Sequence, residues 1–173
     1  MVAGNWFDTD GLYRQYGTTK AVPETGGDYL RYGEYRQQEY TIDLTTLTPF
    51  GTNIIQSNTT FIPAGVFVES VEIDVEVAAT SAGAPTFNVG LIANDRSTVT
   101  SATGFVNAIA LATLAQGAKV ILTGGSAGAG GYIGTTTGIP STGYLIAQAG
   151  VAVYTAGKVK VRINYRTTST ITQ

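Results

Sequence analysis

Side chains that commonly perform catalysis are scarce in this chain. Its 173 residues include no His, no Cys and one Met, which is Met1. Without His, a nucleophilic Ser or Thr would need a Lys, a carboxylate or an N-terminal amine as its base, and no spacing nominates one. Two carboxylates roughly 5–10 Å apart suffice for glycoside hydrolysis, which leaves Glu24, Glu34, Glu39 and Glu69 as formal candidates. On this balance we predict that the protein is not an enzyme.

Two stretches begin like ligand-binding loops without completing the pattern. Residues 8–11 (Asp-Thr-Asp-Gly) start like a calcium loop, but the third acidic position and the distal bidentate Glu are missing. Residues 124–131 (Gly-Gly-Ser-Ala-Gly-Ala-Gly-Gly) are similar to phosphate-binding loops, but no Gly-Lys-Ser/Thr follows and the next residues are β-like. We therefore predict a turn at residues 8–11, a flexible surface loop at 124–131, and no metal or cofactor.

Charge is distributed unevenly along the chain. All twelve acidic residues lie at or before Asp95, so residues 1–95 carry twelve acidic side chains and four basic ones, whereas residues 96–173 carry six basic and none acidic. The net charge is only −2. Two interpretations stay open: a bipolar molecule steers neighbouring copies into contact, or the two halves interleave in one fold and cancel internally.

Composition argues against several kinds of partner. The basic residues are few and the pI is about 5.0, which does not fit nucleic-acid binding. The first residues lack the basic and apolar regions of a signal peptide, and no later stretch reaches about 18 uninterrupted apolar residues, so we predict no membrane partner. The absence of Cys fits a reducing interior or a particle assembled there.

Aromatic residues are concentrated in the first 40 positions. This segment shows no sustained period of 2 or 3.6, yet it is too aromatic for an ordinary disordered tail. We predict an extended arm over residues 1–40 that lies on another surface, followed by a domain over residues 41–173. The alternative, an arm that folds back on its own domain, stays open. The aromatic residues are Trp6, Phe7, Tyr13, Tyr16, Tyr29, Tyr32, Tyr35 and Tyr40.

Period-2 alternation beyond the arm predicts β-strands. Residues 71–77 (Val-Glu-Ile-Asp-Val-Glu-Val) alternate apolar and acidic side chains, as a strand with one buried face does. After a turn at 81–83, residues 84–92 are expected to pair with this strand in a hairpin. A second hairpin is expected from residues 151–154 and 158–165.

One segment has the spacing of a helix. In residues 104–117, Phe105, Ile109 and Leu114 recur near period 3.6, and Gly117 could end the helix. We expect at most this one short helix. About eight short strands separated by Gly, Ser and Thr turns predict an all-β fold, an antiparallel β-sandwich, and favour a jelly roll.

Two of the predicted strands have solvent-exposed faces of opposite charge. Opposite charges across a sheet help to choose pairing and register more than they add stability. The two strands are therefore expected to be neighbours in one sheet, or each stripe pairs with a different copy; the sequence leaves both arrangements open. The acidic stripe is Glu72, Asp74 and Glu76, and the basic stripe is Lys158, Lys160 and Arg162.

A family resemblance rests on residues 11–18 (Gly-Leu-Tyr-Arg-Gln-Tyr-Gly-Thr), 40–47, 61–77 and 85–91. Together these stretches resemble the head decoration, or cement, proteins of tailed bacteriophages, and the likeness spans most of the chain. It implies a β-sandwich or jelly roll with an extended arm. It also implies copies grouped around symmetry axes and clamping capsid subunits against internal pressure.

The resemblance implies a structural virion protein that binds the outer surface of a phage capsid and stabilises it. Its partners would be the major capsid protein and further copies of itself, a trimer being favoured over a dimer. It would act on the virion exterior after assembly in the host cytoplasm. A tail or host-recognition module that binds cell-surface glycan, and a head-tail connector component, stay open as alternatives. The arm residues expected to make contact are Trp6, Phe7, Tyr13, Arg14 and Tyr16.

Overall fold

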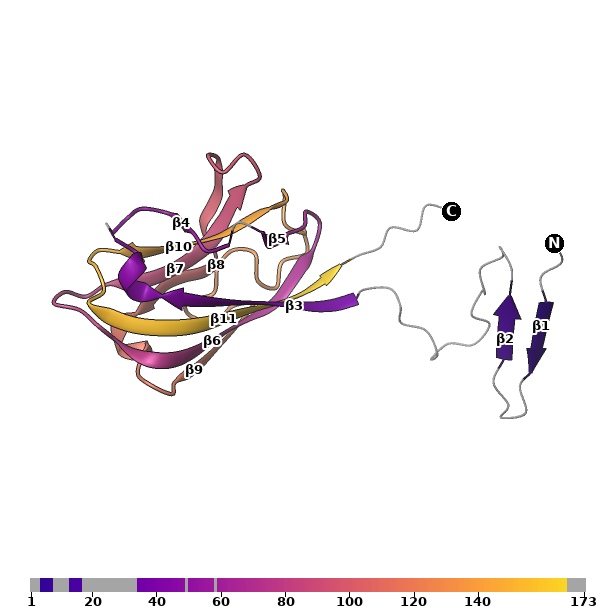
Figure 1. The fold of residues 1–173 in the computed structure, drawn as a ribbon, viewed down its shortest axis with the longest axis horizontal. Helices are drawn as coiled ribbons and strands as arrows, with labels where there is room; N and C mark the ends of the chain where they lie inside the picture. The colour runs from indigo at the N-terminus through magenta and orange to yellow at the C-terminus, as the bar shows by residue number, and fades with distance from the viewer. Residues whose placement is uncertain (1–3, 8–12, 17–33, 49, 58, 168–173) are drawn as a thin grey trace. The chain divides into compact units, whose positions relative to one another are not determined.

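The computed structural model divides the chain into two units, Met1–Tyr32 and Gly33–Gln173. In the first unit, β1 (Gly4–Phe7) and β2 (Tyr13–Tyr16) form an antiparallel pair (Figure 1). The other strands that the structure describes belong to the second unit. The described residues are 4–7, 13–16, 34–48, 50–57 and 59–167.

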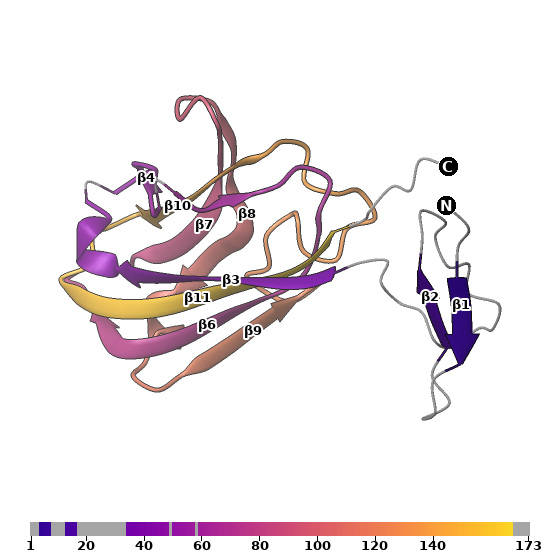
Figure 2. The same cartoon turned by 45° about the vertical axis from the view of Figure 1, so that its right-hand side comes forward.

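Two antiparallel sheets pack face to face in the second unit (Figures 1 and 2). The β11 sheet has the strand order β3-β11-β6-β9, and the β10 sheet has the order β4-β10-β7-β8, with β5 also pairing with β10. The all-β antiparallel sandwich predicted from the sequence is confirmed. The strands of the β11 sheet are β3 (Glu34–Asp43), β6 (Phe67–Thr80), β9 (Lys119–Thr123) and β11 (Ala156–Thr167). Those of the β10 sheet are β4 (Ile54–Ile55), β5 (Phe61–Ile62), β7 (Thr86–Ala93), β8 (Val99–Ala110) and β10 (Gly143–Gly150).

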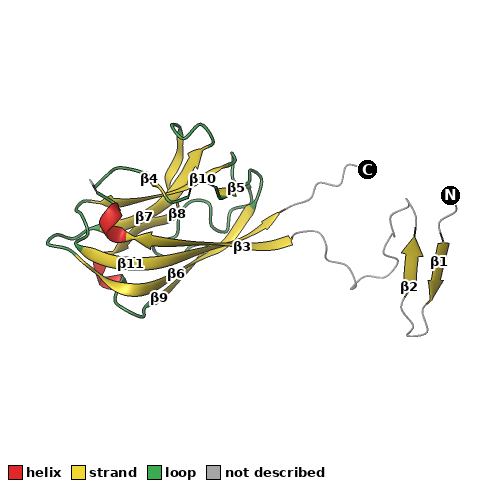
Figure 3. Ribbon diagram, in the orientation of Figure 1, coloured by secondary structure: helices red, strands yellow, loops and turns green. Residues whose placement is uncertain are grey.

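The predicted helix at residues 104–117 is wrong. Residues up to Ala110 belong to β8, and the described part of the chain has only two short 3₁₀ turns, η1 (Leu44–Thr46) and η2 (Leu111–Thr113) (Figure 3). The spacing of four between Phe105 and Ile109 is compatible with a strand as well as with a helix. Pairing of β8 with β7 decides between them. In the described residues, no helix is long and apolar enough to span a membrane.

Both predicted hairpins are also wrong, because the chain crosses between sheets at those turns. β6 pairs with β11 and β9, whereas β7 pairs with β10 and β8, so residues 81–85 connect different sheets. Residues 151–154 form no strand, and they connect β10 of one sheet with β11 of the other. Alternation identifies the buried face of a strand but does not identify its neighbours.

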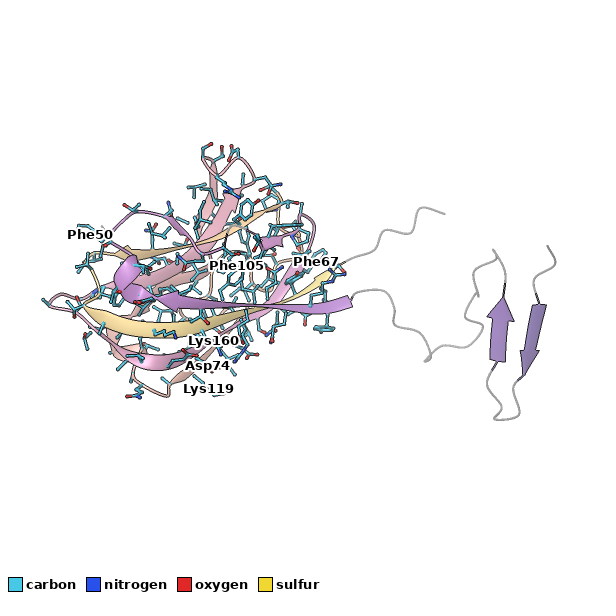
Figure 4. All side chains as sticks on the ribbon, in the orientation of Figure 1. Phe50, Phe67, Asp74, Phe105, Lys119 and Lys160 are labelled. Atoms are coloured by element: carbon cyan, nitrogen blue, oxygen red, sulfur yellow. The ribbon has the colours of Figure 1, made fainter. Side chains whose placement is uncertain are left out.

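The core lies between the sheets and contains inward side chains of both. Phe105 and Phe87 are fully buried there (Figure 4 labels Phe105). The alternation predicted for β6 holds up to Val75, but Val77 is 47% exposed. A bulge around Lys158 pairs it with Val77 and turns both side chains outward. The inward pairs of β6 and β11 are Val71 with Ile163, Ile73 with Val161 and Val75 with Val159.

The sandwich begins earlier than the sequence indicated. β3 starts at Glu34, so the arm predicted over residues 1–40 overlaps the first strand of the β11 sheet. Tyr40 is buried in the core, and its hydroxyl donates to Oε1 of Gln38 at 2.7 Å. The Tyr40 side chain therefore packs in the core of the sandwich and does not belong to the arm.

The glycine-rich segment, residues 124–134, includes the surface loop predicted at residues 124–131 and is hydrogen-bonded to both sheets. The amide of Gly130 donates to the carbonyl of Phe105 on β8 at 3.1 Å, and the amide of Gly134 donates to the carbonyl of Val68 on β6 at 2.9 Å. A Cβ on Gly130 would lie 2.3 Å from the main chain of Gly104. Glycine is therefore required for the close approach of this segment to β8.

Candidate interaction surfaces

Arg162 is the centre of an ion-pair network on the outer face of the β11 sheet. Its Nε donates to Oε2 of Glu39 on β3 at 2.8 Å. Its Nη1 donates to Oδ2 of Asp74 on β6 and lies 3.8 Å from Oε2 of Glu72. The hydrogen bonds from Arg162 hold the pKa of Glu39 and that of Asp74 below the usual carboxyl value, because they favour the charged form.

Two lysines extend the network along β11. The Nζ of Lys160 lies 3.4 Å from Oε1 of Glu39 and 3.4 Å from Oε1 of Glu76. The Nζ of Lys158 lies 3.4 Å from Oε2 of Glu76. The hydrogen bond to Glu39 is the main reason that the pKa of Lys160 is raised. The two lysines of β11 therefore pair with one carboxylate on β3 and one on β6.

Further ion pairs lie on the edge strand β9 and near the end of β11. The Nζ of Lys119 on the edge strand β9 lies 3.5 Å from Oδ1 of Asp74. Near the end of β11, Arg166 pairs with Glu69, and Glu69 Oε2 accepts a hydrogen bond from the hydroxyl of Tyr35 at 2.6 Å. Figure 4 labels members of the network on β11, β6 and β9.

The two predicted charge stripes lie side by side in one sheet of one chain. In the register of β6 and β11, Glu72 is opposite Arg162 and Asp74 is opposite Lys160. Of the two arrangements that the sequence left open, the structure has the pairing within a chain. Acids from the first half of the chain and bases from the second half thus cancel on one surface. Eight residues form the network around Arg162, Glu69 and Arg166 form a pair beside it, and we count the pair with the network. The ten members, five acids and five bases, are Glu39, Glu69, Glu72, Asp74, Glu76, Lys119, Lys158, Lys160, Arg162 and Arg166.

The carboxylates considered for catalysis are engaged in this network where the structure describes their side chains. Glu39 and Glu69 each contact at least one basic side chain. A general acid needs a raised pKa, whereas the pKa of Glu39 is lowered. Glu24 and residues 8–11 lie outside the described residues, as does the side chain of Glu34. Among the described residues, no group of three or more His, Cys, Asp or Glu could hold a metal ion.

The outer face of the β10 sheet carries no charged side chain along its strands. The sequence has no Asp, Glu, Lys or Arg in residues 44–68, 77–94, 97–118 or 120–157. These stretches contain every described strand of the β10 sheet. Since alternate residues of β10 face the core, the residues between them and their cross-strand partners face outward. We call this the uncharged face, and its outward residues are Ile55, Phe61, Thr86, Asn88, Ile92, Val99, Tyr144, Ile146 and Gln148. Three of them, Asn88, Ile92 and Ile146, are covered within the chain.

An apolar row crosses four strands of the uncharged face. Tyr144 on β10 pairs with Phe61 on β5 and with Ile92 on β7, and Ile92 pairs with Val99 on β8. The guanidinium of Arg96, in the turn between β7 and β8, lies 4.8 Å from the centroid of the Tyr144 ring. Sequence reasoning missed this row because its members come from four separate segments. The charge-free stretches were the signal that could have revealed the face.

The arm residues proposed as contacts fall in the hairpin of the first unit. In its register Trp6 is opposite Arg14 and Phe7 is opposite Tyr13, while Tyr16 is opposite Gly4. The backbone therefore brings four of these five positions together in two cross-strand pairs. Their side chains lie outside the described part of the structure.

Comparisons with known proteins identify the fold. No family model matches the sequence, and no curated protein matches it. Among solved structures, a chain of the "Capsid of Ralstonia phage GP4" is 16% identical, with a TM-score of 0.53 over 88% of this chain and 92% of that one. A chain of the "Cyanophage Pam1 capsid asymmetric unit" is also 16% identical, with a TM-score of 0.51 over 87% and 99%.

These likenesses define a class of fold. The protein has a β-sandwich fold related to that of chains in phage capsid structures. Coverage is high for both members of each comparison, so the matched chains consist of little besides this fold and are about as long as the present chain. At this level of identity the likeness establishes the fold, and function has to be argued from the surfaces.

Proposed function

We propose that the protein is a structural component of a phage virion, and that it acts as a decoration or cement protein on the outer surface of the capsid. The observation that carries the proposal is the fold shared over nearly the whole length of chains from two phage capsid structures. The resemblance of the sequence to decoration proteins supports the same function independently of the fold. The major capsid protein is the proposed partner, and the virion exterior, after assembly in the host cytoplasm, is the proposed location.

We infer further that the sandwich is a jelly roll. The strand orders β3-β11-β6-β9 and β4-β10-β7-β8 support this topology, because each sheet alternates strands from early and late parts of the chain. Between successive described strands of the sandwich, only the β4–β5 and β7–β8 connections stay within one sheet. A jelly roll wraps two Greek keys into two sheets in this manner.

In the proposed mechanism the two units have different tasks. The sandwich supplies a rigid platform, because its core and its ion-pair network hold it independently of the hairpin. The hairpin unit binds the capsid shell through Trp6, Phe7, Tyr13, Arg14 and Tyr16. Two strands of four residues are marginally stable alone in water, so the hairpin gains stability by packing on a partner. Copies group around a symmetry axis, a trimer being favoured over a dimer, and their modest contacts add through avidity.

The copy number of the protein in purified particles tests the proposal. Quantitative mass spectrometry would give its abundance relative to the major capsid protein. Abundance near that of the capsid protein supports decoration. A handful of copies per particle would point to a connector or tail component, and absence from the particles would refute a virion role.

A further inference from the structure

The two outer faces of the sandwich differ in what contact with a protein would do to them. On the β11 sheet, a partner would remove water from ten charged side chains that already have partners within the chain. Such desolvation is unfavourable unless new pairs replace the lost water. On the uncharged face no charge on the strands would be desolvated. Because interface cores are depleted in charged residues, the uncharged face is the side suited to a protein partner.

The apolar row gives this face a centre. Phe61 is 49% exposed and Val99 is 40% exposed, although both belong to strands of a well-packed sheet. Between them lie Tyr144 and the buried Ile92, and Arg96 stacks on the Tyr144 ring. Aromatic residues and Arg are the types enriched at the centres of protein interfaces. The row therefore has the composition of an interface centre and is only partly covered within the chain.

We propose that copies of this chain meet through the uncharged face, with the row of Phe61, Tyr144, Ile92 and Val99 at the centre of the contact. The inference deepens the proposed function and rests on it, since that function groups copies around a symmetry axis. It assigns the contact between copies to the β10 sheet, and it leaves the hairpin unit free to bind the shell.

Charge complementarity selects a second copy as the occupant. The face requires a partner surface that is itself free of unpaired charge, and the chain supplies such a surface in its own uncharged face. In a two-fold contact the same patch of both copies meets, whereas in a three-fold contact adjoining parts of the uncharged face meet. The β11 sheet of a neighbouring copy does not fit there, because its ten charges would lose water and gain no partner.

Sedimentation velocity of the full chain tests this inference with two matched substitutions. Val99→Lys and Ile121→Lys each place one positive charge at an exposed β-branched residue of an edge strand. Val99 lies on β8 of the β10 sheet, and Ile121 lies on β9 of the β11 sheet. We expect Val99→Lys to weaken self-association about 100-fold or more over a series from roughly 1 to 100 µM, because the contact would bury a lysine on a face whose strands carry no acidic partner for it. Ile121→Lys should sediment like the unmodified chain. Phe61→Lys is the second variant, and far-UV circular dichroism verifies that each protein is folded.

The outcomes separate the possible occupants. An unmodified chain that stays monomeric throughout the series overturns the inference, and so does an oligomer that persists in both Val99→Lys and Phe61→Lys. If the chain is monomeric but Val99→Lys no longer binds particles, the capsid shell occupies the face instead of a second copy. If the chain self-associates through this face but is absent from particles, the proposed function fails while the contact between copies stands.

Discussion

Replacing Phe105 by Ala should destabilise the sandwich strongly. Phe105 lies on β8, is fully buried between the sheets, and makes an edge contact with Tyr132 at a centroid distance of 5.5 Å. Truncating a buried Phe to Ala removes apolar contacts and leaves a cavity, which costs about 3–5 kcal/mol of unfolding free energy. The contact with Tyr132 accounts for about 0.5–1.5 kcal/mol of this loss. We therefore expect a melting temperature lower by roughly 6–20 °C.

Urea denaturation followed by far-UV circular dichroism measures this loss, with all proteins at one concentration so that self-association contributes equally. Phe50→Ala is the matched control, because Phe50 is 55% exposed in a loop at the end of the sandwich (Figure 4). Its effect should stay within about 0.5 kcal/mol. Equal effects of the two substitutions would refute the packing of the Phe105 side chain between the sheets. A double-mutant cycle with Tyr132→Leu isolates the ring contact.

Three further predictions concern the network, the glycine-rich segment and the hairpin. Because Arg162 lowers the folded-state pKa of Asp74, that carboxylate stabilises the protein above its unfolded pKa and ceases to do so as the pH falls through the lowered folded value. Urea midpoints between neutral and acidic pH should therefore fall less steeply in Arg162→Met, and an unchanged slope would contradict this role. Gly130→Ala should lower the free energy of unfolding by about 1–3 kcal/mol, because its Cβ meets the main chain of β8. Gly131→Ala, with open space around its Cβ, should lower it far less. Similar losses for the two variants would argue against the close approach of this segment to β8. Deleting residues 2–32 should leave the urea midpoint of the sandwich unchanged and abolish binding to particles, so normal binding of the truncated chain would disprove the task given to the hairpin.

The sequence was sufficient for the class of fold, and it identified the two strands that carry charged faces. Alternation along β6 and β11 identified the buried side chains except at Val77, since a strand places successive residues on opposite faces. The opposite signs of their wet faces made them plausible neighbours, and the structure pairs Glu72 with Arg162 in register. Both inferences depend on the alternation of apolar and charged residues within a single strand, and the folded structure retains this alternation.

Sequence reasoning failed where a short segment had more than one compatible neighbour. The turn predicted at residues 81–83 and the strand predicted at residues 151–154 both lie where the chain crosses to the other sheet. Residues 104–110 have spacing that fits a helix, but pairing with β7 makes them a strand. The glycine-rich segment gave no local sign that it would hydrogen-bond to both β8 and β6.

By itself the sequence determined an all-β sandwich, an aromatic N-terminal segment and a division of charge along the chain. Only the tertiary structure decided that this division becomes one neutral ion-pair network on the β11 sheet and one uncharged face on the β10 sheet. The physical reason is that burial depends on the identity of each residue, whereas strand neighbours depend on contacts between residues far apart in the chain. The row from Phe61 to Val99 exists only because four separate strands come together in register.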